Sequence, residues 1–346
     1  MLEFVIIGSG QAGLSMAYHL KQHNKNFLVV DGGSNIGESW LNRWDSLKLF
    51  TPTEYNNLPG LKFDAPKGYY PNKFEVANYF KSYVEHFEIP IQFNTLITSV
   101  VKCEKGFFTL THKEGEIQTK NIIVATGPFH TPYTPPCHTK IASEITQMHS
   151  NYYKAIDQLQ GGDALVVGGG DSGYQILDEI SKDKSRNVYF SGLTNVNSIP
   201  QQFLGKTLWW WFNLIGFLSF TKYSWIGKKI ISIPQPVIGT DVKEILSREN
   251  VISVGRTKDA MATDLFFEKD KASSIKNIIW ATGYRPNFQW IEGLELDENN
   301  YPKNHRGVSN IEGVYFIGLP WMYTRASATL GGVSKDAAYL ANVICK

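Results

Sequence analysis

The sequence predicts an α/β protein in which one structural plan occurs twice. Each copy reads as a buried strand, a glycine-rich turn, a helix and a second strand, which is the order of a βαβ unit. The two glycine clusters lie 160 residues apart, and each copy later has an apolar strand that ends in Ala-Thr-Gly. We therefore expect two Rossmann-like dinucleotide-binding domains, with the second inserted into the first.

The first copy begins at the N-terminus. The apolar run at 3–7 predicts a strand, 11–23 has the periodicity of a helix with one apolar face, and 27–30 predicts the next strand. An amphipathic helix is expected at 75–87. The stretch 37–72 before it shows little periodicity, and loops of this length usually have a function.

The first glycine turn is Gly8-x-Gly10-x-x-Gly13, and Asp31 follows it by 18 residues, at the end of the second predicted strand. Small residues let the backbone turn tightly and approach a pyrophosphate, whose charge is favoured at a helix N-terminus. A carboxylate at Asp31 can accept a hydrogen bond from a ribose hydroxyl. The residues predicted to bind this first dinucleotide are Gly8, Gly10, Gln11, Ala12, Gly13, Asp31 and Gly32.

The second glycine turn is Gly168-x-Gly170-x-x-Gly173, again between a predicted strand (164–167) and a predicted helix (173–181). The predicted binding residues here are Gly168, Gly170, Asp171, Ser172, Gly173 and Ser191.

Ser191 ends the next predicted strand, 187–190, at the position that corresponds to Asp31. It has no charge to repel a 2′-phosphate, and its hydroxyl could donate to one, so NADPH is favoured and NADH is not excluded. No arginine follows directly, which makes Arg186 a candidate phosphate ligand. A plain strand end is the alternative reading of Ser191.

The repeat sets the expected domain boundaries. Residues 1–130 and 281–346 form the first domain, and 131–280 form the second, with an apolar excursion at about 200–235. Later segments of these domains are expected to be strands at 278–281 and 314–317 and an alanine-rich helix near 327–344.

Composition excludes several classes of function. A length of 346 residues fits about two domains, and a net charge of +2 without a long basic run argues against a nucleic-acid partner. Cys103, Cys137 and Cys345 are odd in number and widely spaced, so we expect no disulfide scaffold, no dithiol centre and no metal site. Without a signal-peptide pattern, a cytoplasmic location is expected.

One segment of the excursion could contact a membrane. From Leu208 to Phe220 the chain is uncharged and mostly apolar, yet shorter than the ~20 residues that a spanning helix needs. It reads either as a core or lid helix or as an element for peripheral contact with a membrane or a lipophilic substrate. Four lysines flank it and support the second reading: Lys206, Lys222, Lys228 and Lys229.

Two dinucleotide sites in one chain imply that one holds a flavin and the other presents a nicotinamide for hydride transfer. Here the sequence resembles the class B flavin-dependent monooxygenases, above all their bacterial branch of cation-efflux and potassium-transport flavoproteins, and is similar to plant indole-pyruvate monooxygenases. The resemblance spans nearly the whole chain. It rests on GSGQAG at 8–13, GESW at 37–40, WDSLKLFTP at 44–52, YPNKFEVANYF at 70–80, VATG at 124–127, GGGDSG at 168–173, WATGYRPNF at 280–288, FIGLPW at 316–321 and SATLGG at 327–332.

The resemblance implies FAD in the first domain and NADPH in the second. It implies that Gly37 and Trp40 lie against the flavin ring and that Arg43 lies near the cofactor cleft, although a surface salt bridge is an alternative for Arg43. Ser327 would begin a helix that faces the flavin. Further residues implied to pass close to the cofactors are Thr126, Gly127, Thr282, Gly283 and Gly318.

The implied reaction is NADPH-dependent oxygenation of a small lipophilic substrate, at a soft nitrogen or sulfur centre or a ketone, by O2 through a peroxyflavin. The flavin carries the chemistry, so no catalytic residue is assigned beyond Arg43 as a candidate. Such a reaction needs a dry pocket. The aromatic residues available to line it are Trp40, Trp44, Phe50, Tyr55, Trp209, Trp210, Trp211 and Trp321.

Departures from the family pattern keep other functions open. The family fingerprint FxGxxxHxxxY survives as His149 and Tyr153, but Ser143 and Ile145 replace its phenylalanine and glycine. One alternative is an NAD(P)H:flavin oxidoreductase without oxygen insertion. Another is a redox-sensing flavoprotein accessory to a membrane transporter. The sequence leaves the substrate and the existence of a homodimer open.

Overall fold

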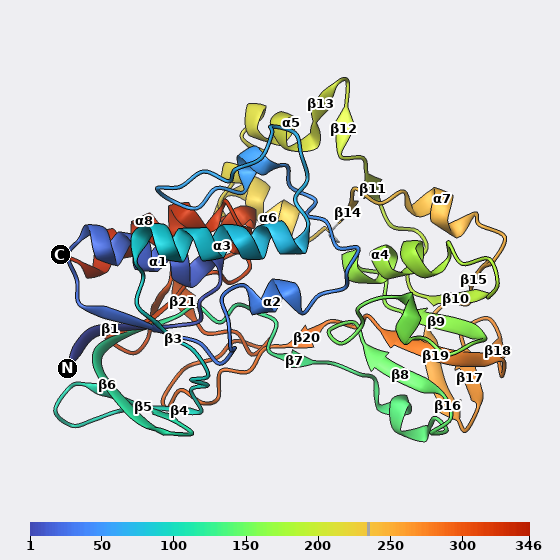
Figure 1. The fold of residues 1–346 in the computed structure, drawn as a ribbon, viewed down its shortest axis with the longest axis horizontal. Helices are drawn as coiled ribbons and strands as arrows, with labels where there is room; N and C mark the ends of the chain where they lie inside the picture. Colours follow the sequence, from blue (N-terminus) through green and yellow to red (C-terminus); the bar gives the residue numbers. More distant parts are fainter. Residues whose placement is uncertain (234–235) are drawn as a thin grey trace.

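The computed structural model describes residues 1–233 and 236–346, and it divides into two lobes, each built on a parallel sheet (Figure 1). The first lobe holds the order β23-β6-β1-β2-β3, all parallel, with antiparallel strands at the edges. Its strands are β1 (Leu2–Ile7), β2 (Phe27–Val30), β3 (Ile91–Gln92), β4 (Ser99–Lys102), β5 (Phe108–His112), β6 (Gly115–Val124), β21 (Asn304–His305), β22 (Val308–Ser309) and β23 (Val314–Phe316).

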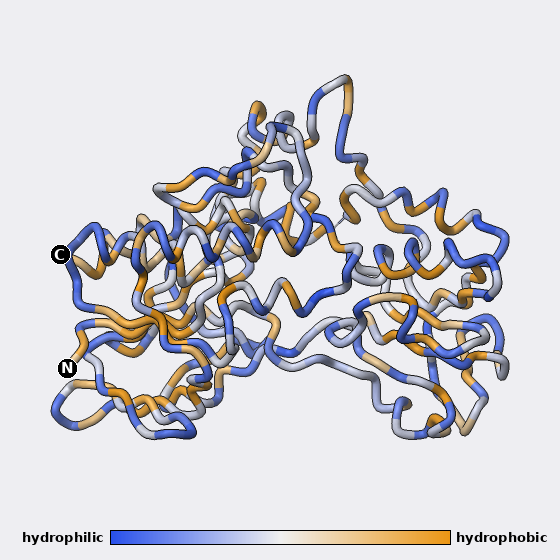
Figure 2. The backbone as a smooth tube through the Cα atoms, in the orientation of Figure 1, coloured by the Kyte–Doolittle hydropathy of each residue, from blue (hydrophilic) through white to orange (hydrophobic). Residues whose placement is uncertain are grey.

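Successive side chains of β1 point to opposite faces of this sheet, as in any strand. Phe4 and Ile6 pack toward α1 (Gln11–Gln22), α3 (Lys73–Phe87) and α8 (Val333–Ile344). Val5 and Ile7 pack toward the hairpin of β4 and β5. The strands of both sheets are accordingly the most hydrophobic stretches of the chain (Figure 2).

The second lobe repeats this plan. Its sheet has the order β15-β10-β9-β19-β8 and is wholly parallel. Helices α4 (Asp171–Ile180) and α7 (Val242–Leu246) cover one face, and an antiparallel sheet of β16, β17 and β18 covers the other. The bounds are β8 (Thr146–His149), β9 (Asp163–Val167), β10 (Val188–Ser191), β15 (Val251–Ser253), β16 (Thr257–Met261), β17 (Asp264–Phe267), β18 (Lys271–Ala272) and β19 (Ile275–Trp280).

Two short strands join the lobes. β7 (Thr131–Pro132) leaves the first lobe, and β20 (Tyr284–Arg285) returns beside it as its antiparallel partner. The second nucleotide-binding fold is therefore inserted into the first, which confirms the predicted fold class. The predicted boundaries at 130/131 and 280/281 fall close to this link, and as exact limits they remain our proposal.

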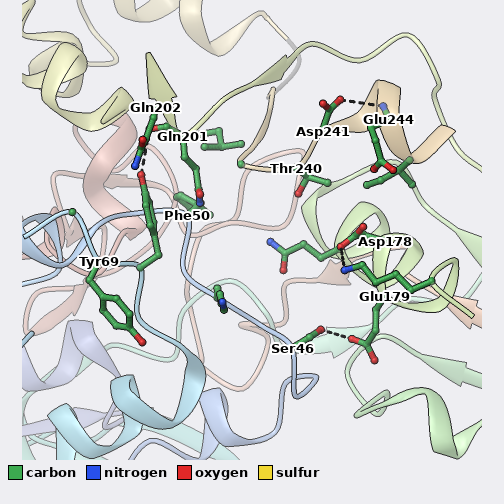
Figure 3. Close-up of a pocket in the computed structure, with 18 residues that line it drawn as sticks. Ser46, Phe50, Tyr69, Asp178, Glu179, Gln201, Gln202, Thr240, Asp241 and Glu244 are labelled. Carbon is green, nitrogen blue, oxygen red and sulfur yellow. Dashed lines mark hydrogen bonds and ion pairs between the residues drawn. The ribbon is translucent and has the colours of Figure 1, made fainter. Parts of the chain in front are cut away.

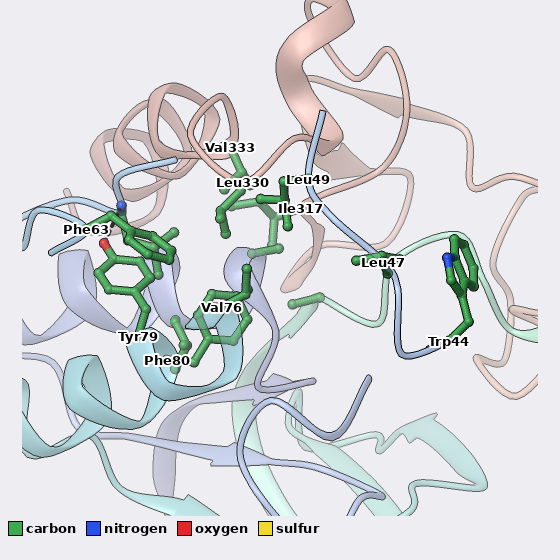
Figure 4. Packing of buried hydrophobic residues seen from close by; sticks show 14 of the residues in the cluster. Trp44, Leu47, Leu49, Phe63, Val76, Tyr79, Phe80, Ile317, Leu330 and Val333 are labelled. Atoms are coloured by element: carbon green, nitrogen blue, oxygen red, sulfur yellow. Dashed lines mark hydrogen bonds between the residues drawn. The ribbon is translucent and has the colours of Figure 1, made fainter. Parts of the chain in front are cut away.

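Helix ends differ from the prediction where local chemistry decides them. α3 starts at Lys73 rather than 75, because Asn72 accepts hydrogen bonds from the N–H groups of Phe74 (2.9 Å) and Glu75 (3.0 Å), and the Glu75 carboxylate bonds back to the Asn72 N–H. Figure 4 shows Val76, Tyr79 and Phe80 of this helix among the packed core residues.

The predicted helix at 327–344 is wrong at its start. A short 3-10 helix, η5 (Arg325–Ala328), contains Ser327, and α8 begins only at Val333. The break contains two glycines, and a Cβ at Gly331 would lie 2.1 Å from the Tyr55 carbonyl oxygen. Close packing on that loop separates the two helices.

The apolar excursion is a chain of small elements, and its last two predicted residues, 234 and 235, lie outside the described residues. α5 ends at Leu214, two residues before Gly216 adopts a φ of +67°. In the described ranges, no helix is long and apolar enough to cross a bilayer. The elements are β11 (Ser198–Ile199), β12 (Gln202–Phe203), β13 (Lys206–Thr207), α5 (Leu208–Leu214), η4 (Phe217–Ser219), α6 (Trp225–Ile231) and β14 (Val237–Ile238).

Candidate functional site

The first glycine turn packs α1 directly onto β1. Gly8 has a φ of +108°, and a Cβ there would lie 2.7 Å from the carbonyl oxygen of Ala125. A Cβ at Gly13 would lie 1.8 Å from the carbonyl oxygen of Gly8. Gly10 differs from both, because its φ is −73° and an added Cβ would meet nothing within 4 Å. Protein packing therefore accounts for two of the three glycines but not for Gly10.

The second turn reproduces this arrangement. A Cβ at Gly168 would lie 2.1 Å from the Ala281 carbonyl oxygen, and one at Gly173 would lie 1.9 Å from that of Gly168. Gly170 again has ordinary extended backbone, at φ −95°, and open space where a side chain would be. In both turns the middle glycine leaves room for something outside the chain.

The helix N-termini behind these turns suit a phosphate. Gly10 and Gly170 are the N-cap positions of α1 and α4, and neither supplies a side-chain capping bond. Gln11 and Ala12 begin α1, and Ser172 is the second residue of α4, so the first backbone N–H groups of each helix belong to predicted site residues. These groups and the helix dipole favour an anion such as a pyrophosphate.

Asp31 lies against the first turn. Its Oδ2 accepts hydrogen bonds from the Ser9 N–H (2.6 Å) and the Ser9 hydroxyl (2.7 Å), and its Oδ1 accepts one from the Gly33 N–H (2.8 Å). An ionised carboxylate has about four acceptor sites, so one remains for a ribose hydroxyl. Gly32, beside it, is exposed and touches Leu96.

Three more predicted residues lie at the same edge of the first sheet. Thr126 and Gly127 follow the end of β6, directly after Ala125, on which Gly8 packs. Gly318 follows β23, and a Cβ there would lie 2.6 Å from the Ala12 Cβ at the start of α1. The structure thus brings the glycine turn, Asp31 and these strand ends together, and their contact with a flavin cofactor stays a prediction.

Trp40 lies in a short helix, α2 (Glu38–Leu41), that interrupts the predicted loop 37–72, and a buried lysine that no sequence pattern marks fixes the end of this helix. Lys73 is 2% exposed, and its ammonium donates to the carbonyl oxygens of Leu41 (3.1 Å) and Arg43 (2.6 Å) and to the Asp45 carboxylate (2.6 Å). Trp40 is half-buried against the main core.

Packing within the protein is enough to explain why residue 37 is a glycine. A Cβ on this residue would lie 2.8 Å from Ala77 of α3, so glycine permits the close packing of the loop on that helix. Contact of Gly37 and Trp40 with a flavin ring stays a prediction.

Arg43 fastens the lobes to each other. Its guanidinium donates to the Tyr284 hydroxyl in β20 and lies over the rings of Phe129 (5.6 Å) and Tyr284 (5.5 Å). Among the described residues no carboxylate pairs with it, so the alternative of a surface salt bridge is wrong. Arg43 lies beside the interdomain link, and whether it contacts a cofactor stays a prediction.

Ser191 is buried, and its hydroxyl is already engaged. Its Oγ accepts the Thr257 N–H (2.8 Å) and lies 2.8 Å from the Thr257 hydroxyl. Arg186 is wrong as a phosphate ligand, since it bonds Asp183 and the Gln160 carbonyl at the N-terminal ends of the strands, opposite the glycine turn.

Two exposed cations flank Thr257, the partner of Ser191: Lys258, which pairs with Glu268, and Arg256, which no local sequence pattern marks. Arg256 immediately precedes Thr257, and its side chain is exposed at the carboxyl end of β15. Strand pairing of β10 with β15 is what brings Arg256 to the second site.

Asp171 and Arg325 are opposite charges that lie near enough to influence each other's pKa, and among the described residues they form no ion pair. Burial raises the pKa of the Asp171 carboxyl, and the Ile238 N–H and Arg325 oppose this shift. Burial lowers the pKa of the Arg325 guanidinium, and Asp171 opposes that shift. The Asp171 Oδ1 is buried without a hydrogen-bond partner among the described residues. Such a carboxylate near an arginine that has no carboxylate partner in the described part of the chain suits a polar ligand group.

Ser327, two residues beyond Arg325, caps η5 internally. Its hydroxyl oxygen accepts the N–H groups of Tyr323 (3.1 Å) and Thr324 (3.0 Å), and the side chain is fully buried. The prediction that Ser327 begins a helix is therefore wrong, because this residue lies inside η5 and α8 begins at Val333. Arg325 of the same 3-10 helix was not predicted, because no local pattern marks it.

The second lobe's strand end is tied to the link by His149. Its Nε2 lies 2.9 Å from the Gly283 carbonyl oxygen, and its Nδ1 accepts the Asn151 N–H (3.1 Å). These bonds define a neutral ring, and burial lowers its pKa. Thr282 donates to the Tyr133 carbonyl, so Thr282 and Gly283 serve the crossing between the lobes.

The predicted aromatic pocket forms only in part. Trp209 stacks on Phe50 at 5.9 Å, donates to the Phe50 carbonyl (2.8 Å) and lies near Tyr55. Trp210 and Trp211 turn away toward the neighbouring hairpin and do not join them. Trp44 is part of the core, and Trp321 is only half-buried.

A cavity of about 760 Å³ lies between the lobes, with Phe50 and Tyr69 on one side and α4 and α7 on the other (Figure 3). Its α4 and α7 side carries four carboxylates, and no residue of either glycine turn lines it. We do not assign it as the cofactor site, because the acids would repel a pyrophosphate. These acids are Asp178, Glu179, Asp241 and Glu244.

Known proteins agree with this geometry. Residues 5–195 match the family model described as pyridine nucleotide-disulphide oxidoreductase. The uncharacterized oxidoreductase CzcO of Bacillus subtilis (strain 168) is 42% identical over 98% of both chains. The probable indole-3-pyruvate monooxygenase YUCCA7 of Arabidopsis thaliana is 26% identical over 98% of this chain and 86% of its own. A flavin-containing monooxygenase from Stenotrophomonas maltophilia has the same fold, with a TM-score of 0.80, 23% identity and coverage of 99% and 98%.

The fold, the paired glycine turns and these relatives define a flavin-dependent oxidoreductase with two dinucleotide-binding domains, and the predicted resemblance to the class B flavin monooxygenases is confirmed. The chain belongs to the pyridine nucleotide-disulphide oxidoreductase family. FAD and NADPH are the cofactors of its flavin monooxygenase relatives. Both turns fit such groups, because each has room before an uncapped helix N-terminus.

Proposed function

We propose that the protein is an NADPH-dependent flavin monooxygenase that oxygenates a small lipophilic substrate. The observation that carries this proposal is the pair of matched glycine turns, each with a middle glycine that protein packing does not require. Gly8 and Gly168 pack on Ala125 and Ala281, the residues just before the two interdomain crossings, so both turns lie next to the junction of the lobes. This placement suits hydride transfer between two bound dinucleotides.

FAD belongs in this proposal to the first turn and NADPH to the second. Asp31 holds the FAD ribose, and the α1 N–H groups hold its pyrophosphate. Bound FAD, reduced by NADPH, supplies the activation of O2. Arg256 binds the 2′-phosphate of NADPH, because its exposed guanidinium lies next to the Ser191–Thr257 pair, whereas Lys258 on the other side of Thr257 pairs with Glu268.

The pair of Asp171 and Arg325 has a role in the same proposal. An amide offers both an N–H donor and a carbonyl acceptor, so the carboxamide of nicotinamide complements the two side chains. We propose that they hold the ring in register for hydride transfer. Asp171 begins α4 in the second lobe, whereas Arg325 belongs to η5 in the first, so the contact spans the two domains.

The cysteines favour O2 over a protein thiol as the electron acceptor. Cys103, Cys137 and Cys345 are all free and widely separated in sequence, and none belongs to either glycine turn. Burial raises the pKa of Cys137 and of Cys345, which keeps these thiols protonated. The absence of a second cysteine nearby in sequence supports oxygenation or simple oxidase turnover rather than a dithiol relay.

The proposal is tested by aerobic stopped-flow absorbance of the NADPH-reduced protein, with a tertiary amine, a thioether and a cyclic ketone as probes. A monooxygenase gives an absorbance transient before the oxidised flavin spectrum returns, and one probe is converted in proportion to NADPH consumed. Peroxide release without any converted probe would support the alternative, an NAD(P)H:flavin oxidoreductase. No NADPH oxidation at all would support the redox sensor.

Location and assembly are part of the proposal. Three free cysteines support a reducing compartment, as in the cytoplasm. A homodimer stays a prediction, and so does a membrane contact of the segment 208–220. Leu208 and Trp209 are buried, so not all of this segment can make such a contact.

A further inference from the structure

One surface of the excursion is apolar, exposed and positively charged. It consists of the β12–β13 hairpin and the outer side of α5, and we call it the apolar projection. Figure 1 shows these elements extending beyond the rest of the molecule. Exposed fractions of its side chains are 57% for Phe203, 75% for Leu204, 38% for Trp210, 62% for Leu214 and 61% for Ile215.

The projection is a single patch held together by its own contacts. The Trp211 ring nitrogen donates to the Phe203 carbonyl (3.0 Å), and the two rings lie edge to face at 6.3 Å. Trp210 and Trp211 also meet edge to face at 4.8 Å. The Lys206 ammonium lies 5.7 Å from the centre of the Trp210 ring. Hairpin and helix therefore present one continuous surface.

The opposite side of α5 fixes the orientation of this surface. Leu208 and Trp209 are buried, and Trp209 is hydrogen-bonded to Phe50 of the first lobe. Tyr70 of that lobe donates to the Gln201 carbonyl at the base of the hairpin (3.2 Å). The projection is thus anchored on the body of the protein, and its apolar side points outward without rearrangement.

The tip of the hairpin is unfavourable for folding alone. Leu204 has a φ of +49° and Gly205 one of +70°, a turn in which asparagine or glycine is the usual first residue. A leucine at this position is destabilising, because its backbone is strained and its apolar side chain is exposed to water. Large side chains in a strained, exposed turn are typical of a contact surface.

Charge along the excursion itself has one sign, although the acids Asp178, Glu179, Asp241 and Glu244 of the cavity lie near the base of the hairpin at Gln201 and Gln202. From 184 to 240 the sequence contains no aspartate or glutamate, whereas it contains Arg186 and lysines at 184, 206, 222, 228 and 229. The second helix of the excursion repeats the pattern, with Trp225 76% exposed and the Lys229 ammonium 5.7 Å from its ring centre. Aromatic and aliphatic side chains beside lysines, without acids, complement an anionic lipid surface.

We propose that the apolar projection docks the protein on the surface of an anionic lipid bilayer. Phe203 and Leu204 at the hairpin tip and Leu214 on α5 enter the acyl boundary, while Lys206 contacts the lipid phosphates. The proposal moves the contact from the predicted segment 208–220 to the hairpin and one side of α5. It does not depend on the reaction that the flavin supports.

The test measures co-sedimentation of the FAD-containing protein with vesicles of phosphatidylglycerol and phosphatidylcholine in equal amounts. Leu204→Asp and, independently, Leu214→Asp should each lower the partition coefficient at least tenfold, because a carboxylate opposes both insertion and the lipid charge. Met261→Asp is the matched control, since Met261 is 65% exposed in the second lobe outside the projection and should bind as the wild type does. Bound FAD and the thermal midpoint verify folding.

Varying the lipid charge distinguishes the contribution of Lys206 from that of the inserted apolar side chains. Lys206→Glu should weaken binding to these vesicles, and vesicles of phosphatidylcholine alone should bind the wild type less. Absence of wild-type binding, equal losses in Met261→Asp, or no effect of anionic lipid would overturn the proposal. A dimer in analytical ultracentrifugation that Leu204→Asp dissociates, without vesicle binding, would assign the surface to a second copy of the chain.

Discussion

Replacing Gly10 with alanine should weaken FAD binding and leave the fold intact, whereas Gly13→Ala should damage the fold itself. The two changes add the same methyl group three residues apart. At Gly10 the new Cβ meets nothing within 4 Å. At Gly13 it would lie 1.8 Å from the Gly8 carbonyl oxygen, so α1 must move away from β1 by more than an ångström.

The magnitudes follow from these distances. Overpacking of a tight contact costs about 1–3 kcal/mol, and a backbone contact cannot yield as a side chain does, so Gly13→Ala belongs at the upper end. At Gly10 the methyl group occupies the space where a phosphate oxygen would approach the helix N–H groups. One lost hydrogen bond to a charged group costs about 1.5–3 kcal/mol, which raises the Kd for FAD roughly 10- to 150-fold.

The assay compares both variants as apoproteins. Quenching of FAD fluorescence gives the Kd, and urea unfolding gives the free energy of unfolding without the cofactor's contribution. We expect wild-type stability with weak FAD binding for Gly10→Ala, and lost stability for Gly13→Ala. The reasoning is refuted if Gly10→Ala binds FAD with the wild-type Kd, or if both variants unfold alike.

Four further predictions follow from the site and the link between the lobes. Gly170→Ala should keep its FAD and slow anaerobic reduction by NADPH at least tenfold in stopped flow, since its methyl group blocks only the second turn. Lys73→Met should lower the free energy of unfolding in urea by about 2–4 kcal/mol, because two carbonyls and a carboxylate lose their donor. Arg256→Gln should raise the KM for NADPH about tenfold in steady-state assays and leave that for NADH unchanged, because NADH lacks the 2′-phosphate. Stability should fall with acid: burial lowers the pKa of His149 and His130 below 6.5 in the folded protein, so the unfolded chain binds more protons below that pH and the thermal midpoint decreases from pH 7 to 5.

Each of these predictions has an outcome that contradicts it. Loss of FAD in Gly170→Ala would refute two separate sites. A Lys73→Met protein as stable as the wild type would mean that its polar partners find other donors. An equal rise in KM for both nucleotides would remove Arg256 from the phosphate site. A midpoint that does not change with pH, or the same slope in a protein that carries both His149→Gln and His130→Gln, would show that these rings do not carry the acid sensitivity.

The repeated plan could be predicted because its signals are local. A glycine turn between a β-strand and a helix constrains its own neighbourhood, so the spacing of Gly8, Gly13 and Asp31 predicts where they meet. The Ala-Thr-Gly strand ends could likewise be matched to each other. What the sequence could not show is which element packs on Gly331, and the predicted helix from Ser327 was wrong for that reason.

The rest of the site depends on contacts between distant segments. Arg256 comes near Ser191 only through the pairing of β10 with β15, and Arg325 comes near Asp171 only because the lobes meet. The division of α5 into a buried side at Trp209 and an exposed side at Trp210 follows from packing on Phe50. An uncharged apolar run gives no sign of which side is buried.

The insertion of one domain in the other has a consequence for synthesis on the ribosome. β23 is the neighbour of β6, and α8 packs against α1, yet roughly 190 residues separate β6 from β23. At about 5–20 residues per second, the nascent first domain waits about 10–40 s with an open sheet edge and an uncovered apolar helix face. The second domain, whose ends meet at β7 and β20, can fold during that interval. Chaperone dependence should therefore concentrate on the N-terminal third of the chain while translation continues.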